Sequence, residues 1–125
     1  MHKFKIRVYV EVTDRFGVVY HANYIKYFER ARTEFLRQQG YSVETIYQSG
    51  YSLLVSKLDV KFLKAAKLDD ELIIQTTIEK MKMSLVIFKQ EILSLTGDLM
   101  TSANVKVVGL DKNNQLCNLT KIMSA

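Results

Sequence analysis

The sequence has no proline, no tryptophan and a single cysteine, and each scarcity excludes a class of structure. Cys117 has no partner within the chain, so an internal disulfide is excluded. His2 and His21 are too few to build a histidine and cysteine metal site. Without proline and with only five glycines, no stretch has the composition of a flexible linker. We therefore expect a single domain over residues 1–125, with no disulfide, no metal and no redox cofactor.

Long hydrophobic runs are also missing from the chain. No apolar run approaches the roughly 18 residues of a membrane-spanning helix, and the first ten residues alternate charges where a signal peptide has its apolar core. We expect a soluble, cytoplasmic protein without membrane insertion. The net charge of +5 favours anionic partners. The basic residues form no block and no nucleic-acid motif is present, so nucleic acid is not an expected partner.

Hydrophobic periodicity predicts a strand followed by a long helix. Residues 4–12 alternate apolar and polar side chains, as a half-buried strand does. From Asn23 the apolar residues recur every three or four positions, which predicts an amphipathic helix with Asn23 as its N-cap and Gly40 at its end. A second, short helix is predicted between Ser42 and Gly50.

Four segments rich in β-branched residues follow, and they predict an antiparallel sheet. They cover residues 53–64, 71–80, 84–95 and 101–110. In the first of them, Leu54 is expected on the same face as the later apolar residues. One strand, one long helix and four strands indicate an α+β fold in which a five- or six-stranded sheet covers its apolar face with the helix. Because edge strands need partners, we expect a dimer joined by strand edges.

The segment VTDRFGVVYHANYIKYFERARTEFL, residues 12–36, resembles the signature of the hot-dog-fold acyl-CoA thioesterases, in particular the 4-hydroxybenzoyl-CoA thioesterase and YbgC-like branch. The residues that keep the spacing of this family are Asp14, Gly17, Tyr20, His21, Asn23 and Tyr24. Residues 60–72, VKFLKAAKLDDEL, also resemble a segment of the family. Arg15 and Phe16 depart from it, since relatives commonly carry small residues there, and we expect them to narrow the acyl pocket.

The resemblance implies a function as well as a fold. It implies hydrolysis of acyl-CoA or acyl carrier protein thioesters in a homo-oligomer, either a dimer or a dimer of dimers, with sites built from two subunits. Asp14 and His21 are the implied catalytic residues, and the His21 backbone is the implied oxyanion donor. Tyr20 belongs to the loop that shapes this site, and Asn23 and Tyr24 are expected to contact substrate.

The chemistry of a thioester suits this residue set. The thiolate leaves easily, because its conjugate acid has a pKa of about 8.5 on the cysteine scale, so no strong general acid is required. Asp14 attacks the carbonyl directly in one route and deprotonates a water in the other, and the sequence leaves both open. Free backbone N–H groups at the start of the helix stabilise an oxyanion. Gly17 lets the chain reverse between acid and helix, because glycine accepts positive φ. The His21 side chain either orients water or substrate or has a structural role.

Other charged residues have competing interpretations. Lys57, Lys61, Lys64 and Lys67 form either a positive edge for the phosphates of coenzyme A or an acidic carrier protein, or a solvated strand face; we predict substrate contacts for Lys61 and Lys64. Glu29 is the rival catalytic carboxylate, and a simple ion pair with Arg32 or Lys26 is its alternative. Arg32 falls within the apolar arc of the helix, so we expect it to have an acidic partner, to contact substrate near a dimer seam, or to extend into solvent.

Two alternative functions remain open at this stage. A non-catalytic acyl-binding or envelope-associated scaffolding module of the same fold is one, and a hydroxyacyl dehydratase of the same fold is the other. A serine hydrolase is not supported, because the sequence has no G-x-S-x-G elbow.

Overall fold

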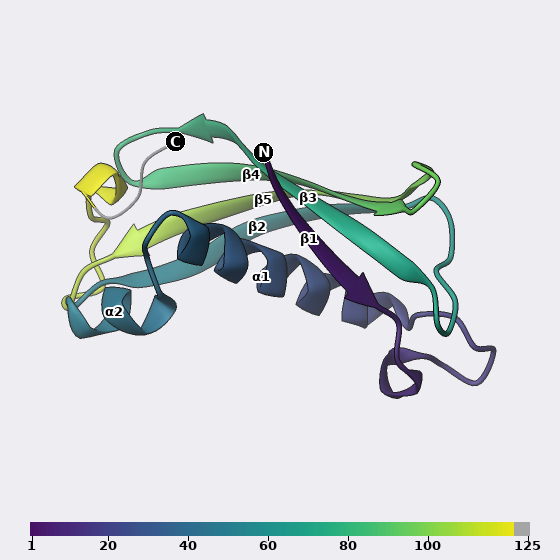
Figure 1. The fold of residues 1–125 in the computed structure, drawn as a ribbon. Helices are drawn as coiled ribbons and strands as arrows, with labels where there is room; N and C mark the ends of the chain where they lie inside the picture. The colour runs from purple at the N-terminus through teal and green to yellow at the C-terminus, as the bar shows by residue number, and fades with distance from the viewer. Residues whose placement is uncertain (122–125) are drawn as a thin grey trace.

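The computed structural model describes residues 1–121, which form one antiparallel sheet, a long helix and a short helix (Figure 1). The elements are β1 (His2–Arg7), the 3₁₀ turn η1 (Val10–Val12), α1 (His21–Gln38), α2 (Val43–Gln48), β2 (Ser52–Phe62), β3 (Glu71–Met81), β4 (Leu85–Ser94), β5 (Leu99–Leu110) and the 3₁₀ turn η2 (Leu119–Lys121). The strands pair in the order β1-β3-β4-β5-β2, so β1 and β2 are the edges. The predicted α+β class is confirmed, with five strands.

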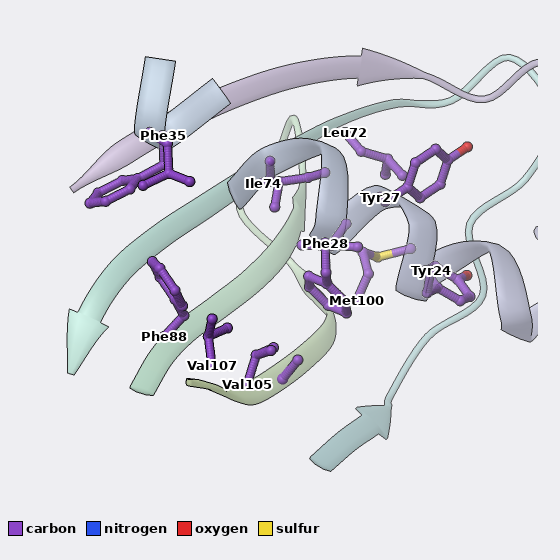
Figure 2. Close-up of a cluster of buried hydrophobic side chains, with 14 of the residues drawn as sticks. Tyr24, Tyr27, Phe28, Phe35, Leu72, Ile74, Phe88, Met100, Val105 and Val107 are labelled. Carbon is purple, nitrogen blue, oxygen red and sulfur yellow. The ribbon is translucent and has the colours of Figure 1, made fainter. Parts of the chain in front are cut away.

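The core lies between α1 and the face of the sheet that α1 crosses (Figure 1). The buried residues of α1 are Tyr24, Tyr27, Phe28, Ala31, Phe35 and Leu36. Phe28 and Ile74 are fully buried within this cluster, part of which Figure 2 shows. Each such side chain contributes about 1.5–3 kcal/mol through removal of apolar surface from water. Among residues 1–121, no helix is both long and apolar enough to cross a membrane.

The first strand is shorter than its sequence pattern predicts. The alternation extends over residues 4–12, but pairing ends where Arg7 lies opposite Glu71, the first residue of β3. Just before Glu71 the chain turns at Asp69, whose φ is +70°. Val10 therefore has no strand to pair with and enters η1 instead. The prediction of a strand is therefore wrong for the second half of residues 4–12. The apolar alternation continues there, but β3 offers no further residues to pair with.

The start of α1 also differs from the prediction, whereas its end agrees. Tyr20, in an extended conformation, is the N-cap. Asn23 lies inside the first turn, and its side-chain amide donates to the Val12 carbonyl oxygen at 2.9 Å, so its predicted role as N-cap is wrong. At the other end Gly40 has a φ of +91°, and its N–H donates to the Arg37 carbonyl at 3.0 Å. This is the left-handed glycine stop that the sequence predicts.

The short helix α2 forms where it is predicted. Its capping box consists of two hydrogen bonds, from the Thr45 N–H to Ser42 Oγ at 3.0 Å and from the Ser42 N–H to Thr45 Oγ1 at 3.2 Å. Gly50, with a φ of +90°, follows the helix. Ile46 buries its side chain in the core, so α2 closes the end of the space between α1 and β2.

A bulge in β2 changes which of its residues face α1. The register against β5 shifts at Ser56, which is the extra residue of the bulge. As a result Val55 and Leu58 line the same cavity against α1, although they are three residues apart. Leu54 is 51% exposed, so the prediction that it shares a face with Leu58 is wrong.

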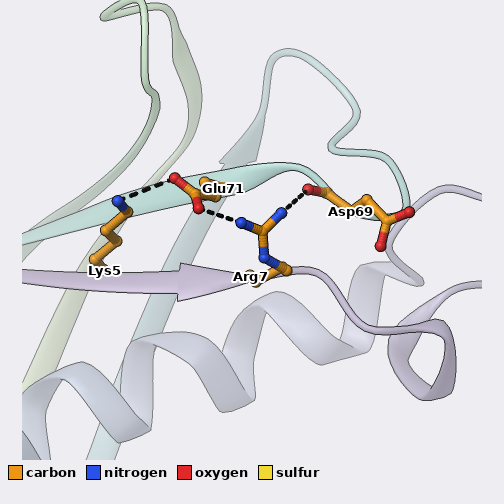
Figure 3. A network of polar contacts seen from close by, with 4 residues as sticks. All are labelled: Lys5, Arg7, Asp69 and Glu71. Carbon is orange, nitrogen blue, oxygen red and sulfur yellow. Dashed lines mark hydrogen bonds and ion pairs between the residues drawn. The ribbon is translucent and has the colours of Figure 1, made fainter.

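Polar contacts fasten β1 to the start of β3 (Figure 3). The Glu71 carboxylate accepts from Arg7 and lies 3.0 Å from Lys5 Nζ. Arg7 also donates to the Asp69 carbonyl oxygen at 2.7 Å. The hydrogen bond from Lys5 and the positive charges of Lys5 and Arg7 lower the pKa of the Glu71 carboxyl, against a smaller opposing effect of burial. These contacts hold the chain that leads into the candidate site.

Candidate active site

Asp14 opens a tight turn, in which only one of its carboxylate oxygens is occupied. Asp14 Oδ1 accepts from the Phe16 N–H at 2.8 Å, and the Asp14 carbonyl accepts from the Gly17 N–H at 3.1 Å. Gly17 has a φ of +76°, which confirms the predicted reversal at this glycine. The Asp14 N–H donates to the Val18 carbonyl at 2.9 Å and closes the turn. Among residues 1–121 the second carboxylate oxygen, Oδ2, has no hydrogen-bond or ion-pair partner.

The two residues at the tip of this turn point away from the protein. Phe16 is 74% exposed, and the Arg15 guanidinium lies 4.9 Å from the centre of its ring. Neither side chain lines a cavity described below. One protomer therefore gives no support to the expectation that they narrow the acyl pocket, and it stays a prediction.

The segment that precedes β3 holds this loop in place. The Val19 N–H donates to the Ala66 carbonyl at 2.8 Å, and the Leu68 N–H donates to the Gly17 carbonyl at 3.0 Å. The Ala66 N–H donates in turn to Tyr24 Oη at 3.1 Å inside the core. The Tyr24 hydroxyl therefore accepts a backbone hydrogen bond that holds the loop. The same buried residue also lines the site.

The start of α1 offers unpaired backbone donors. The Tyr20 N–H donates to the Val12 carbonyl at 3.0 Å, and the Asn23 N–H donates to the Tyr20 carbonyl at 2.8 Å. Between them, the N–H groups of His21 and Ala22 find no acceptor within residues 1–121. These two groups carry the positive end of an 18-residue helix dipole. They can donate to an oxyanion, as the sequence predicts for His21.

A cavity of about 240 Å³ lies beside these donors. We call it the His21 cavity; its lining residues are Val19, His21, Tyr24, Phe62, Leu63, Lys64 and Ala65. The His21 ring is exposed, with its centre 4.4 Å from that of Tyr20 and 6.4 Å from that of Phe62. Asp14 does not line the His21 cavity, so one protomer does not bring the predicted carboxylate and oxyanion donors together in one enclosed space.

Of the predicted cationic edge, one lysine reaches this cavity. Lys64 lines it, and its Nζ lies 3.7 Å from Asp98 Oδ1 across a largely exposed pair. Lys61 is exposed on β2 and does not line the cavity. Lys57 lies 3.7 Å from Asp59 and is equally exposed. Exposed pairs of this kind are worth about 0–1 kcal/mol and leave the lysines available to anions.

Arg32 has an uncharged partner in place of the acid that we expected. Its Nη1 donates to Gln90 Oε1 at 3.0 Å, and within residues 1–121 no carboxylate lies at ion-pair distance. Glu29 pairs with neither Arg32 nor Lys26 in this part of the chain, so that prediction is wrong. Burial lowers the pKa of the Arg32 guanidinium, and the charge of Glu29 partly opposes the shift.

Comparison with known proteins decides the family. The family model described as the thioesterase-like superfamily matches residues 8–123. The chain belongs to this superfamily. The acyl-CoA thioester hydrolase YbgC of Escherichia coli O6:H1 is 40% identical to it over 111 residues, which cover 89% of this chain and 83% of the relative. The acyl-CoA thioesterase YbgC of Haemophilus influenzae is 39% identical over 109 residues, which cover 86% of this chain and 79% of that protein.

Solved structures agree with this assignment. A probable thioesterase from Bartonella henselae superposes with a TM-score of 0.87 at 33% sequence identity, covering 94% of this chain and 98% of that one. The predicted hot-dog fold, the predicted family and the prediction that the protein is a thioesterase are confirmed. The assignments of individual site residues stay predictions, because none of these comparisons tests them.

Sequence reasoning missed one polar residue of this thioesterase altogether. Gln90 is fully buried on β4 and makes hydrogen bonds with α1 and β3. A signal for it exists, because Phe88, Gln90 and Ile92 alternate toward the core and a glutamine at such a position needs partners. The identity of those partners depends on which helix covers β4, and the alternation of β4 does not predict that helix.

Proposed function

We propose that this thioesterase hydrolyses acyl-CoA thioesters, with Asp14 as the catalytic carboxylate. One observation carries the proposal. Within residues 1–121, one loop has a carboxylate oxygen without a partner at its beginning, on Asp14, and two backbone N–H groups without an acceptor at its end, on His21 and Ala22. A thioester hydrolase needs a group that attacks or activates water and donors that stabilise the oxyanion.

The proposed reaction uses these groups in sequence. The thioester carbonyl oxygen binds at the His21 and Ala22 N–H groups. In one route Asp14 Oδ2 attacks the carbonyl carbon and the C–S bond breaks, which expels the thiolate. Water then hydrolyses the mixed anhydride, restores the Asp14 carboxylate and supplies the proton that the thiolate takes up. In the other, Asp14 takes a proton from water as the water attacks, and the departing thiolate receives that proton. Both routes release a carboxylic acid and a thiol, and neither needs a metal or a redox cofactor.

A second copy of the chain is part of the proposal. Asp14 lines no cavity with His21 in one protomer, so a site built from two subunits would supply the missing side. The edge strand β2 suits such an assembly, because it is 11 residues long and unpaired on its outer side. Exposed apolar residues on and next to it, Leu54, Val55, Phe62 and Leu63, supply surface for burial. We propose a dimer through β2, which can pair further into a tetramer.

Two observations bear on whether the acyl group is carried by coenzyme A or by acyl carrier protein: the names of the relatives and the charge of Lys64. The two YbgC relatives are named for acyl-CoA, and a further relative, from Arabidopsis thaliana, is named as an acyl-acyl carrier protein thioesterase. Lys64, which lines the His21 cavity, offers a cation to a phosphate of either carrier. We therefore place coenzyme A first and acyl carrier protein second.

Release of free thiol from a panel of acyl-CoA and acyl carrier protein thioesters tests the proposal. The panel contains short, long and aromatic acyl groups on each carrier. We expect turnover of at least one acyl-CoA series, with the acyl carrier protein series equal or slower. Binding of acyl-CoA without thiol release from any substrate would contradict the proposal and favour a non-catalytic acyl-binding module.

A further inference from the structure

Gln90 fixes the position of Arg32 beneath the central helix. Gln90 is fully buried, and its Nε2 donates to the Phe28 carbonyl and to Thr76 Oγ1, each at 3.0 Å. Its Oε1 accepts from Arg32 Nη1 at 3.0 Å. Both amide protons and the amide oxygen are therefore in use, and a buried amide left without partners is destabilising. The glutamine cannot turn without breaking this network, so it holds one nitrogen of the guanidinium in place.

Arg32 has more donors than this network uses. A guanidinium carries five N–H groups in a fixed plane, and Gln90 is its one hydrogen-bond partner among residues 1–121. The charge is partly desolvated, because burial acts on it and no carboxylate lies at ion-pair distance within the same residues. A cation in this state gains from a ligand oxygen more than an exposed arginine does.

Arg32 lines a cavity with mostly apolar walls. This α1–β2 cavity, of about 240 Å³, is lined by Arg32 and Glu29, and its apolar walls include Ile25, Leu36, Leu53, Val55 and Leu58. Along α1 it extends from Ile25 to Leu36, which at 1.5 Å per residue is about 16 Å. Its near end, at Ile25, lies one helical turn beyond His21.

The His21 cavity and the α1–β2 cavity are both lined by residues of α1 and by residues of β2. Phe62, at the end of β2, lies beside His21, while Leu58, Val55 and Leu53 line the cavity progressively farther back along the strand. A thioester carbonyl held at the His21 N–H would therefore have its acyl chain directed toward Arg32. The α1–β2 cavity is apolar at its near end, at Ile25, and the charged pair Glu29 and Arg32 lines its middle, before the apolar end at Leu36.

We propose that Arg32, positioned by Gln90, is a specificity-determining residue that binds a hydroxyl oxygen at the far end of the acyl chain. This inference rests on the proposed function, because the acyl chain must start at His21. A terminal hydroxyl that reaches this pair suits it, since the hydroxyl accepts from the Arg32 guanidinium and can donate to the Glu29 carboxylate. A terminal methyl leaves Arg32 without an acceptor, and a terminal carboxylate is repelled by Glu29.

The test compares thioesters that differ only at the far end of the chain. Hexanoyl-, octanoyl-, decanoyl- and dodecanoyl-CoA are measured beside their ω-hydroxy and ω-carboxy forms. We expect an ω-hydroxy form to exceed its plain counterpart by roughly tenfold or more in kcat/KM at one chain length, as a hydrogen bond to a charged group provides. The advantage is expected in KM with little change in kcat, because the contact is remote from the reacting carbonyl.

Variants assign the preference to the two residues. Arg32→Met keeps the aliphatic stem and removes the donors, and Gln90→Met removes the group that holds them. We expect both to lose the ω-hydroxy preference, while Arg32→Lys keeps part of it. Arg30→Met is the matched control, because Arg30 lies on the same helix outside the α1–β2 cavity. Thermal unfolding of each variant verifies that it folds.

Two results would overturn the inference. One is equal kcat/KM for plain and ω-hydroxy chains at every length in the wild-type protein, which requires no variant to fold. The other is a preference that survives in Arg32→Met. Hydrolysis of the plain acyl-CoA series alone would sustain the proposed function while the inference fails. If no thioester is hydrolysed, the proposed function fails, and calorimetry with free ω-hydroxydecanoic and decanoic acids decides the inference, since equal affinities would contradict it.

Discussion

At the scale of single residues, the candidate site depends on which polar atoms are already satisfied. Asp14 uses one carboxylate oxygen to close its own turn, and the other has no partner in the part of the chain that the structure describes. The Tyr24 hydroxyl and the Gln90 amide, in contrast, are hydrogen-bonded to the backbone or to neighbouring side chains. A side chain whose polar atoms are all hydrogen-bonded holds the structure in place. A side chain with an unused polar atom can act on a substrate. The first kind of residue is expected to affect stability when substituted, and the second to affect activity.

Tyr24→Phe tests the first expectation. The substitution removes the acceptor of the Ala66 N–H, which lies on a fully buried residue. An orphaned buried donor costs about 1–3 kcal/mol, so the free energy of unfolding in urea is expected to fall by that amount. Tyr9→Phe is the control, because the Tyr9 side chain is exposed and its loss of a hydroxyl is expected to change stability by less than about 0.5 kcal/mol. Equal effects of the two substitutions would show that the hydroxyl of Tyr24 does not hold the loop.

At the scale of the elements, the fastening of β1 to β3 should respond to pH. The pKa of the Glu71 carboxyl is lowered in the folded protein, so its contribution to stability is present at neutral pH and is lost as the pH falls through the folded pKa. Glu71→Gln is therefore expected to be less stable than the wild type at pH 7 in low salt, and the difference is expected to vanish in acid. Urea unfolding across this pH range at two salt concentrations measures it. A difference that stays constant with pH would mean that the charge of Glu71 is not its cause.

The elements themselves could be predicted where the sequence pattern is local. Local sequence predicts α1 from its helical period and its end from Gly40. It also predicts β3, β4 and β5 from the alternation of their apolar residues. The errors arose where a distant segment decides the outcome. The alternation of β1 continues past the point where β3 can pair with it, and the bulge at Ser56 depends on registry with β5.

In the candidate site, too, local features could be predicted from the sequence and contacts with distant segments could not. The Asp14 turn and the start of α1 are contiguous in sequence, so their composition alone marked them as unusual. Arg32 and Gln90 are 58 residues apart in sequence. The sequence of the helix alone therefore does not predict that Gln90 is the hydrogen-bond partner of Arg32. The pattern predicts Asn23 as an N-cap because asparagine favours that position. Its side chain instead donates to the Val12 carbonyl, a partner that the helix pattern does not indicate.

At the scale of the whole molecule, assembly through β2 should be necessary for activity. Leu54→Lys places a charge on the exposed edge strand, which opposes strand pairing between copies. Light scattering after size exclusion is expected to give a multiple of the chain mass for the wild type and a lower mass for the variant, with a parallel loss of thiol release. Leu95→Lys, in the exposed β4–β5 connection, is the control and should change neither. A fully active wild-type protein with the mass of one chain would contradict a site built from two subunits.

The central claim is that Asp14 carries the hydrolysis, and one comparison tests it most directly. kcat/KM is measured for the wild type, Asp14→Asn and Glu29→Gln with the same acyl-CoA, each substitution removing one carboxylate charge without changing side-chain size. We expect kcat/KM to fall by about 10²- to 10⁴-fold in Asp14→Asn, the range that a catalytic acid or base supplies, and to change by no more than a few-fold in Glu29→Gln. The opposite result, with Asp14→Asn active and Glu29→Gln inactive, would contradict this claim and assign the reaction to the carboxylate of the central helix.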